Sequence, residues 1–246
     1  MAVAASLTPA PSAGSCGPAA VLPLRAVLGL EPLGWMMAPS ERLAIVGLLA
    51  MLRPRRSLEL GCAEGALTAW LSRYSEQVVT VDIDEKVLRV TQAMANVRAL
   101  HMTTDEATRR IEAEGQRFDL TVVDADHSAE GVRRDLEATL RFSDVVLVHD
   151  TYHPPCRDGI VSVLRERDVW FDLDLVPGGL QPDGLWGGLG IVIPGLPRGA
   201  ARFVTPRRTG FRAMRHWWRW QQHTGRVADA LSRMSRRLGG SPAGAA

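Results

Sequence analysis

A glycine-punctuated turn flanked by acidic side chains is the part of this sequence best suited to binding a small ligand. Residues 57–65 read Ser-Leu-Glu-Leu-Gly-Cys-Ala-Glu-Gly, and the apolar run 78–81 is followed by Asp82. Glycines let a backbone approach a ligand closely, and a carboxylate about 20 residues further on suits ribose hydroxyls. The spacing G-x-x-x-G differs from the G-x-G-x-x-G of dinucleotide sites, and Glu64 would repel the phosphates of a dinucleotide. We therefore expect a nucleoside-like ligand with a cationic end, which Glu59 would attract.

A second group of polar side chains follows two further apolar runs. Asp124 and His127 come after the run 118–123, and Asp150 comes after the run 145–148. Two carboxylates at neighbouring strand ends repel each other unless a positive charge lies between them, and a divalent ion with oxygen ligands, such as Mg²⁺, is suited to that place. Such an ion would also lower the pKa of a bound hydroxyl. His127 has the near-neutral pKa needed to accept the proton of that hydroxyl.

A parallel sheet is needed to bring these two groups together. Strand-like and helical runs alternate along the chain, which is typical of a doubly wound α/β fold. The expected parallel strands span residues 57–60, 78–82, 98–102, 118–123 and 145–148, and the expected helices span 39–52, 64–74, 84–96, 105–113, 129–140 and 158–167. The runs 170–176 and 189–193 have only a Gly/Pro-rich loop between them, so we expect an antiparallel hairpin at the sheet edge. Both polar groups should then lie in one cleft at the carboxyl ends of the strands.

The first turn resembles the first motif of the class I S-adenosylmethionine-dependent methyltransferases, with Ala63 in place of the middle glycine. The resemblance implies a mostly parallel seven-stranded sheet that ends in an antiparallel hairpin. It also implies a set of cofactor-binding residues: Glu59, Gly61, Gly65, Asp82, Asp105 and Asp124. Glu59 and the glycines would lie at the methionyl end, and Asp82 at the ribose. Asp105 would approach the adenine or, equally, serve as a helix N-cap. For the glycines alone, an ordinary strand-to-helix turn is the alternative.

The second group resembles the metal-dependent O-methyltransferases of the catechol, caffeoyl-CoA and macrolide-sugar kinds. Asp124 and Asp150 match their metal positions, and the Asp-x-x-His arrangement resembles that of the sugar O-methyltransferases, in which the histidine is the general base. The resemblance therefore implies Asp124, His127 and Asp150 as catalytic residues. Asp124, Asp150 and His149 are the implied metal ligands. The third ligand stays open between His149, Thr151, His153 and water.

Each of these side chains also has a structural interpretation. Asp124 could cap the helix that follows, although Asp126 or Ser128 is better placed to do so. His127 could be an ordinary surface residue, and His149 could be a packed or hydrogen-bonded histidine.

The composition divides the chain into three parts. Residues 1–23 are rich in Ala, Pro, Ser and Gly, which predicts disorder and does not match a secretory signal. Residues 24–197 form the predicted methyltransferase domain, in which the segment 31–37 could form a lid. Residues 198–246 hold eleven arginines and one acid, a charge of +10, so the rest of the chain carries −8 because the total is +2. Three scattered cysteines favour a reducing compartment, and we expect the protein in the cytoplasm.

The basic tail mixes arginine with three tryptophans, Trp217, Trp218 and Trp220. Such a segment could bind an anionic membrane surface, making the protein peripheral, or contact nucleic acid, for which no RNA-binding motif is present. It could instead pack on its own domain or on a second subunit, so a homo-oligomer stays open.

The sequence favours Mg²⁺-dependent O-methylation of a hydroxyl on a small molecule or sugar, with S-adenosylmethionine as methyl donor. Phenols, polyketides and lipid-linked glycans remain candidate acceptors. One alternative is a non-catalytic cofactor-binding protein that acts through its tail. The other is a metal-independent N-methyltransferase, although the Asn/Asp-Pro-Pro-aromatic signature of the nucleic-acid enzymes does not follow the fourth strand.

Overall fold

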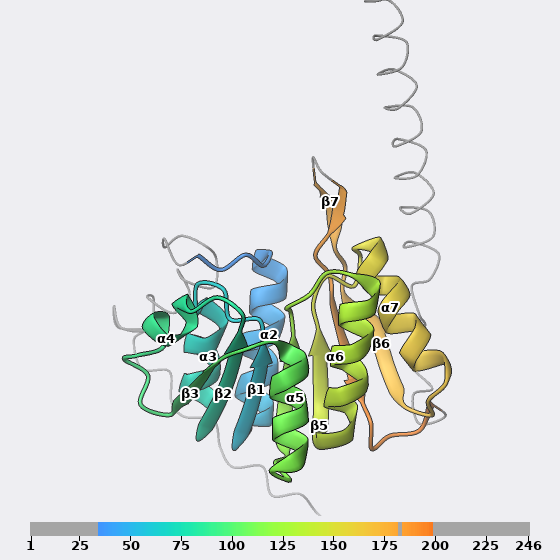
Figure 1. The fold of residues 1–246 in the computed structure, drawn as a ribbon. Helices are drawn as coiled ribbons and strands as arrows, with labels where there is room; N and C mark the ends of the chain where they lie inside the picture. The colour runs from blue at the N-terminus through green and yellow to red at the C-terminus, as the bar shows by residue number, and fades with distance from the viewer. Residues whose placement is uncertain (1–33, 182–183, 199–246) are drawn as a thin grey trace, which may run out of the picture.

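A seven-stranded sheet forms the centre of the protein in the computed structural model, which describes residues 34–181 and 184–198 (Figure 1). Its strands are β1 (Arg56–Leu60), β2 (Gln77–Asp82), β3 (Val97–His101), β4 (Phe118–Val123), β5 (Ser143–Val148), β6 (Trp170–Val176) and β9 (Leu189–Ile193). They lie in the order β3-β2-β1-β4-β5-β9-β6. Strands β1 to β5 are parallel to one another, and β9 runs antiparallel to both β5 and β6. The chain therefore has the predicted doubly wound, mostly parallel sheet with a final antiparallel pair.

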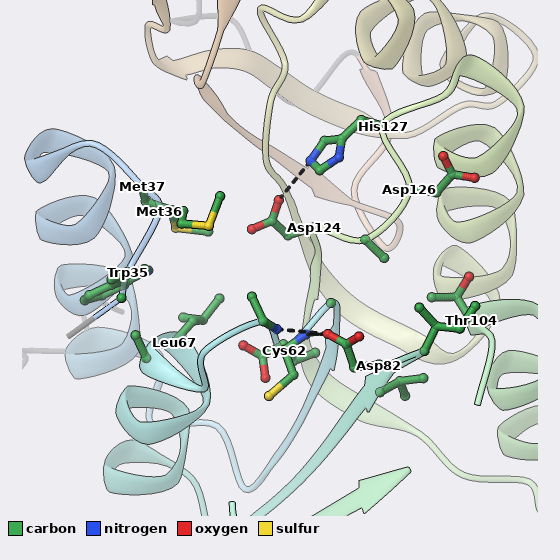
Figure 2. Close-up of a pocket in the computed structure, with 18 of the residues that line it drawn as sticks. Trp35, Met36, Met37, Cys62, Leu67, Asp82, Thr104, Asp124, Asp126 and His127 are labelled. Carbon is green, nitrogen blue, oxygen red and sulfur yellow. Dashed lines mark hydrogen bonds and ion pairs between the residues drawn. The ribbon is translucent and has the colours of Figure 1, made fainter. Parts of the chain in front are cut away.

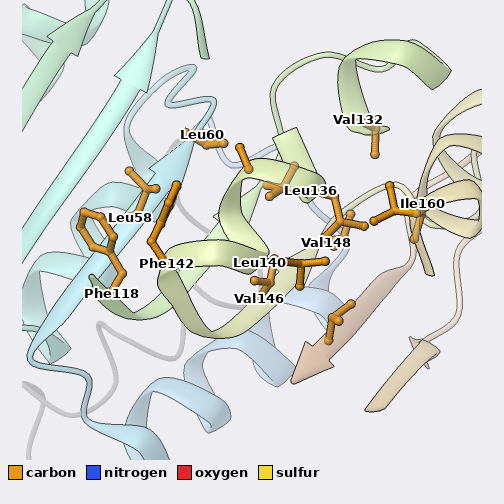
Figure 3. Close-up of a cluster of buried hydrophobic side chains, with 14 of the residues drawn as sticks. Leu58, Leu60, Phe118, Val132, Leu136, Leu140, Phe142, Val146, Val148 and Ile160 are labelled. Carbon is orange, nitrogen blue, oxygen red and sulfur yellow. The ribbon is translucent and has the colours of Figure 1, made fainter. Parts of the chain in front are cut away.

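Helices cover both faces of the sheet. They are α2 (Pro39–Leu52), α3 (Ala66–Tyr74), α4 (Lys86–Val90), α5 (Thr104–Ala113), α6 (Ala129–Phe142) and α7 (Pro154–Arg165). Helices α5, α6 and α7 pack on one face, where Leu136 and Ile160 belong to the same buried cluster as Leu58 and Val146 (Figure 3). Helices α2 and α3 pack on the other face. Alternate residues of the central strands point to the two clusters, which is why these strands read as nearly continuous apolar runs.

Two details differ from the sequence-based expectation. The loop between β6 and β9 contains a small antiparallel ribbon, β7 (Gly179–Gln181) and β8 (Gly184–Trp186). The predicted helix over 84–96 is wrong beyond its first turn, because α4 ends at Val90 and turns follow. The side-chain amide of Asn96 donates to the carbonyls of Ser72 and Ser75 at the end of α3. These bonds hold the chain close to α3, and a continued helix would carry it away.

Several sequence-based predictions lie outside the described residues. These are the disordered segment 1–23, residues 31–33 of the expected lid, and the basic tail apart from Arg198. Across residues 34–181 and 184–198, no helix combines the length and the apolar character needed to cross a bilayer.

Candidate active site

The turn after β1 brings the backbone unusually close to its neighbours. Gly61 has φ +95°, and a Cβ on it would lie 2.0 Å from the carbonyl oxygen of Asp124. The Oδ2 atom of Asp82 accepts hydrogen bonds from the backbone N–H groups of Cys62 at 2.8 Å and Ala63 at 2.9 Å. Ala63 itself has φ 46°, a left-handed conformation that favours glycine. The turn is thus held by the acid at the end of β2, and its shape requires a glycine at position 61.

A cavity of about 460 Å³ opens at the carboxyl ends of β1, β2 and β4. Glu59, Asp82, Asp124 and His127 all lie on its wall, so the parallel sheet brings both polar groups of the sequence to one place. The segment before α2 forms the opposite wall through residues 34–37 (Figure 2). The described part of the expected lid therefore borders the cavity. Its size is in the range of sites that hold small ligands and cofactors.

Glu59 is a buried acid with one oxygen unused. The hydroxyls of Thr68 and Thr80 each donate to its Oε2 at 2.5 Å. Its Oε1 is buried and has no hydrogen-bond partner within the described residues. Burial raises the pKa of Glu59 to about 8 despite the two threonine hydrogen bonds. An unpaired buried acceptor is costly, and a cationic ligand group in the cavity would satisfy it.

His127 lies beside two carboxylates at the other end of the cavity. Its Nε2 is 2.9 Å from Oδ2 of Asp150 and 3.8 Å from Oδ1 of Asp124. The two carboxylates, with Asp124 the larger cause and Asp150 next, raise the pKa of His127 to about 10. The ring also meets Trp186 edge-on at 5.6 Å between centroids, and Trp186 stacks on His153 at 3.9 Å. His127 is thus oriented by acids and bordered by an aromatic wall, with 44% of its side chain exposed.

Asp150 is fixed by its backbone as well as by its partners. It has φ 52°, a left-handed conformation that aspartate tolerates better than most residues. Its Oδ1 accepts a hydrogen bond from the backbone N–H of Gly187 at 2.6 Å. Hydrogen bonds from His127 and His149 outweigh burial and lower the pKa of Asp150 far below its usual range. Asp150 is therefore an ionised acceptor that anchors the loop after β8.

His149 is buried between carboxylates. Its Nδ1 is 3.0 Å from Oδ1 of Asp124 and 3.4 Å from Oδ2 of Asp150, and its Nε2 is 3.2 Å from Oε2 of Glu41. With both ring nitrogens engaged, His149 has no lone pair to offer a metal ion. Asp124, His127 and Asp150 do bring ligand atoms within 4.8 Å of one another. Their facing oxygens already accept hydrogen bonds, however, and Mg²⁺ prefers an octahedral set of oxygens. The residues present do not fit the predicted Mg²⁺ site.

The remaining predicted residues occupy structural positions. Asp105 pairs with Arg109 at 2.6 Å, and the N-cap of α5 is Thr103, so the N-cap interpretation of Asp105 is wrong. Thr103 and Thr104 line the cavity at this point. Helix α6 is capped by Ser128, as the sequence suggested, and Asp124 is not its cap.

Sequence reasoning missed Glu41 and the partners of Trp186. Glu41 follows Ser40 at the start of α2, where an acid is an ordinary first-turn residue. Its contact with His149 joins residues 108 positions apart, and no local pattern signals it. His153, which the sequence offered as a candidate third metal ligand, is the N-cap residue of α7 and the stacking partner of Trp186.

Comparison with known proteins adds to this geometry. Residues 58–151 match a protein-family model described as a methyltransferase domain. Over these residues, which make up less than half of the chain, the protein is similar to a methyltransferase domain. The match runs from within β1 to just past β5, and so includes every acid and histidine that lines the cavity. No curated protein sequence shows a significant match to the chain.

Solved structures of methyltransferases share the fold of this chain. An O-methyltransferase from Bacillus cereus, in complex with S-adenosylhomocysteine, aligns with a TM-score of 0.53 and 20% identity, covering 70% of this chain and 88% of that one. TomG, an O-methyltransferase from Streptomyces achromogenes involved in tomaymycin synthesis, was solved with S-adenosylmethionine. It aligns with a TM-score of 0.51 and 18% identity, covering 69% of this chain and 86% of that one. At these identities the likeness establishes the fold alone.

Proposed function

We propose that this methyltransferase domain transfers a methyl group from S-adenosylmethionine to a hydroxyl group on a small molecule or sugar. One observation carries the proposal. A single cavity has a buried acid with a free oxygen at one end, Glu59, and a histidine held by an aspartate at the other, His127 with Asp150.

The first end of the cavity suits S-adenosylmethionine. When bound, this cofactor supplies a methyl group on a positively charged sulfur, which an acceptor oxygen can attack. Glu59 would bind the cationic amino group through Oε1, which lacks a partner within the described residues. Gly61 lets the turn after β1 lie against the backbone of Asp124 on the cavity wall, because any side chain there would collide with that backbone. Asp82 borders the cavity and retains acceptor capacity for ribose hydroxyls, since each carboxylate oxygen accepts two hydrogen bonds.

The second end suits an acceptor hydroxyl. Asp150 holds Nε2 of His127, so Nδ1 on the far side of the ring is the nitrogen left for the acceptor. Nδ1 would take the hydroxyl proton as the acceptor oxygen bonds to the methyl carbon that the cofactor would release from its sulfur. Trp186 beside His127 offers a flat apolar surface on which a sugar or aromatic ring would rest. Much of the rate would come from this positioning.

The protonation of His127 sets a condition on this role. With a pKa of about 10, the ring is protonated at neutral pH and cannot accept a proton until it loses its own. A positive charge brought into the same cavity lowers the pKa of His127, because like charges disfavour each other. Binding of the cationic cofactor would thus prepare the base, and the reaction would run faster at alkaline pH.

Two free cysteines support a cytoplasmic location, which we also propose. Cys62 and Cys156 are buried free thiols. Free thiols are typical of a reducing compartment. Fractionation of cells that express the full chain would test this, and would show whether the basic tail retains it at membranes.

The test of the function uses the full chain, labelled S-adenosylmethionine and a panel of hydroxylated acceptors. We expect label to move to a hydroxyl of at least one acceptor, and His127→Ala to lower turnover far more than cofactor affinity. Loss of cofactor binding and turnover to an equal degree in that variant would count against the base role. Transfer to amines but to no hydroxyl would replace O-methylation by N-methylation.

A further inference from the structure

Three carboxylates from distant parts of the chain surround one buried histidine. Glu41 comes from the first turn of α2, Asp124 follows β4, and Asp150 follows β5. His149 lies among them with 6% of its side chain exposed, and Glu41 is exposed by only 2%. Charged groups at this depth must pair with one another, because each alone would lose its hydration at high cost.

The contacts of Glu41 fix its charge. Its Oε2 accepts a hydrogen bond from the backbone N–H of Ala38 at 2.6 Å, and its Oε1 accepts one from the backbone N–H of Gly188. Both oxygens are therefore acceptors, which is the behaviour of an ionised carboxylate. Glu41 thus needs a cationic partner at this depth, and His149 is the group within hydrogen-bond distance of Oε2.

The two ring nitrogens of His149 consequently both donate. Nε2 meets Oε2 of Glu41 at 3.2 Å, and Nδ1 meets Oδ1 of Asp124 at 3.0 Å. An ionised carboxylate only accepts hydrogen bonds, so an imidazole between two of them carries both protons and a positive charge. That charge lies 3.4 Å from Oδ2 of Asp150 as well. The ring occupies the position between the two strand-end carboxylates where the sequence predicted a divalent ion.

We propose that the buried imidazolium of His149, held by Glu41, replaces a divalent cation between Asp124 and Asp150, so that the domain works without a metal ion. The inference rests on the proposed function for its meaning in catalysis. A metal ion in the same space would face a fixed positive charge and would have to displace existing hydrogen bonds. Glu41 is then a positioning residue: through His149 it connects α2, which lies next to the cavity wall, to Asp124 and Asp150.

The first test measures metal binding directly. Mn²⁺ is titrated into the full-length protein and followed by electron paramagnetic resonance, with Asp150→Asn as the matched variant. We expect no one-to-one Mn²⁺ site in the wild type. One Mn²⁺ per chain that disappears in Asp150→Asn would overturn the inference. If both proteins bind Mn²⁺ equally, the ion lies away from Asp150, and this result would support the inference.

The second test asks what happens without the imidazolium. His149→Asn takes the buried cation away from Glu41, Asp124 and Asp150, and the two aspartates keep only their contact with His127. This should lower Tm by roughly 10 °C, and Mg²⁺ should restore part of the loss. His101→Asn, an equivalent change at the exposed end of β3, should show neither effect. Equal stabilisation of the wild type and His149→Asn by Mg²⁺ would contradict the inference. If His149→Asn does not fold, the Mn²⁺ titration of the wild type still decides the question.

Failure of the inference can be told apart from failure of the proposed function. A titration with S-adenosylmethionine in the presence of a chelator reports the proposed function alone. If the wild type binds neither S-adenosylmethionine nor Mn²⁺, the inference of a metal-free cluster stands and the proposed function fails. Binding of the cofactor only when Mg²⁺ is added would keep the function and overturn the inference.

Discussion

Glu59 should release a proton when the cofactor binds, and this is the sharpest quantitative consequence of the structure. Its pKa is about 8 in the ligand-free protein, with burial as the main cause. A cationic amino group at Oε1 would favour the ionised form, since an opposite charge at hydrogen-bond distance lowers the pKa of an acid. Replacing Glu59 by Gln keeps the shape of the side chain and removes both the charge and the titration.

The size of the effect follows from this pKa. At pH 7 about nine-tenths of the Glu59 side chains are protonated, so about 0.9 proton should leave per cofactor bound. The folded-state pKa lies above the ordinary value of 4.5, so the acid destabilises the ligand-free protein as pH rises from that value and reaches its full effect above pH 8. At pH 7 this cost is about 3 kcal/mol. Glu59→Gln should therefore be more stable than the wild type by about that amount while binding the cofactor about 10- to 100-fold more weakly.

Isothermal titration calorimetry measures the proton directly. S-adenosylmethionine is titrated at one pH in several buffers of different ionisation enthalpy, and the slope of the binding enthalpy gives the protons released. Urea denaturation of the ligand-free proteins gives the stability difference. Glu64→Gln is the matched control, because Glu64 lies in the same turn, half exposed, and pairs with Lys86 at the surface. Its slope should equal that of the wild type.

Two results would refute this reasoning. One is a slope near zero for the wild type, or the same slope for the wild type and Glu59→Gln. The other is a Glu59→Gln protein that is less stable than the wild type at pH 7, because a buried acid with an unpaired oxygen should gain from neutralisation.

Three further predictions follow from single residues. Gly61→Ala should lower the free energy of unfolding by more than about 2 kcal/mol, since its Cβ would collide with the Asp124 carbonyl. Urea denaturation measures this loss, and unchanged stability would show that the turn can move. Ala63→Gly in the same turn should raise that free energy by about 1 kcal/mol by relieving a left-handed backbone, and any loss of stability would contradict the strain. The kcat/KM of the wild type should rise with pH toward about 10 as His127 loses its proton, and Asp150→Asn should move this rise about one to two pH units lower while reducing the maximal rate. A profile that is flat between about pH 6 and 9 would remove His127 from the proton transfer.

The cofactor end of the site was predictable because its residues lie at strand ends. In a parallel sheet the carboxyl ends share one edge, so the positions of Glu59 and Asp82 follow once the strands are recognised. The same argument brings Asp124, His127 and Asp150 together, and the structure places all five on or beside one cavity.

The electrostatics of the second group was not predictable in the same way. The sequence indicates that something positive must separate two carboxylates, and a metal ion was the partner suggested by residue type. In the arrangement that we propose the partner is His149, which lies between Glu41 and Asp124. That contact is created by the packing of α2 against the sheet, and the first turn of an isolated helix contains no sign of it.

Local competition explains the error over residues 84–96. The run 84–96 contains residues compatible with a helix, but its last part is bound to the end of α3 through Asn96. The position of β9 between β5 and β6 depends on the chain folding back across the sheet, which hairpin patterns do not specify.

The central claim is that one edge of the sheet holds S-adenosylmethionine beside His127. A crystal structure of the full chain with this cofactor tests it most directly. The account predicts the amino group within hydrogen-bond distance of Oε1 of Glu59, the ribose hydroxyls on Asp82, and the methyl group facing the side of the cavity that carries His127. A cofactor bound elsewhere, or with its amino group away from Glu59, would contradict the account.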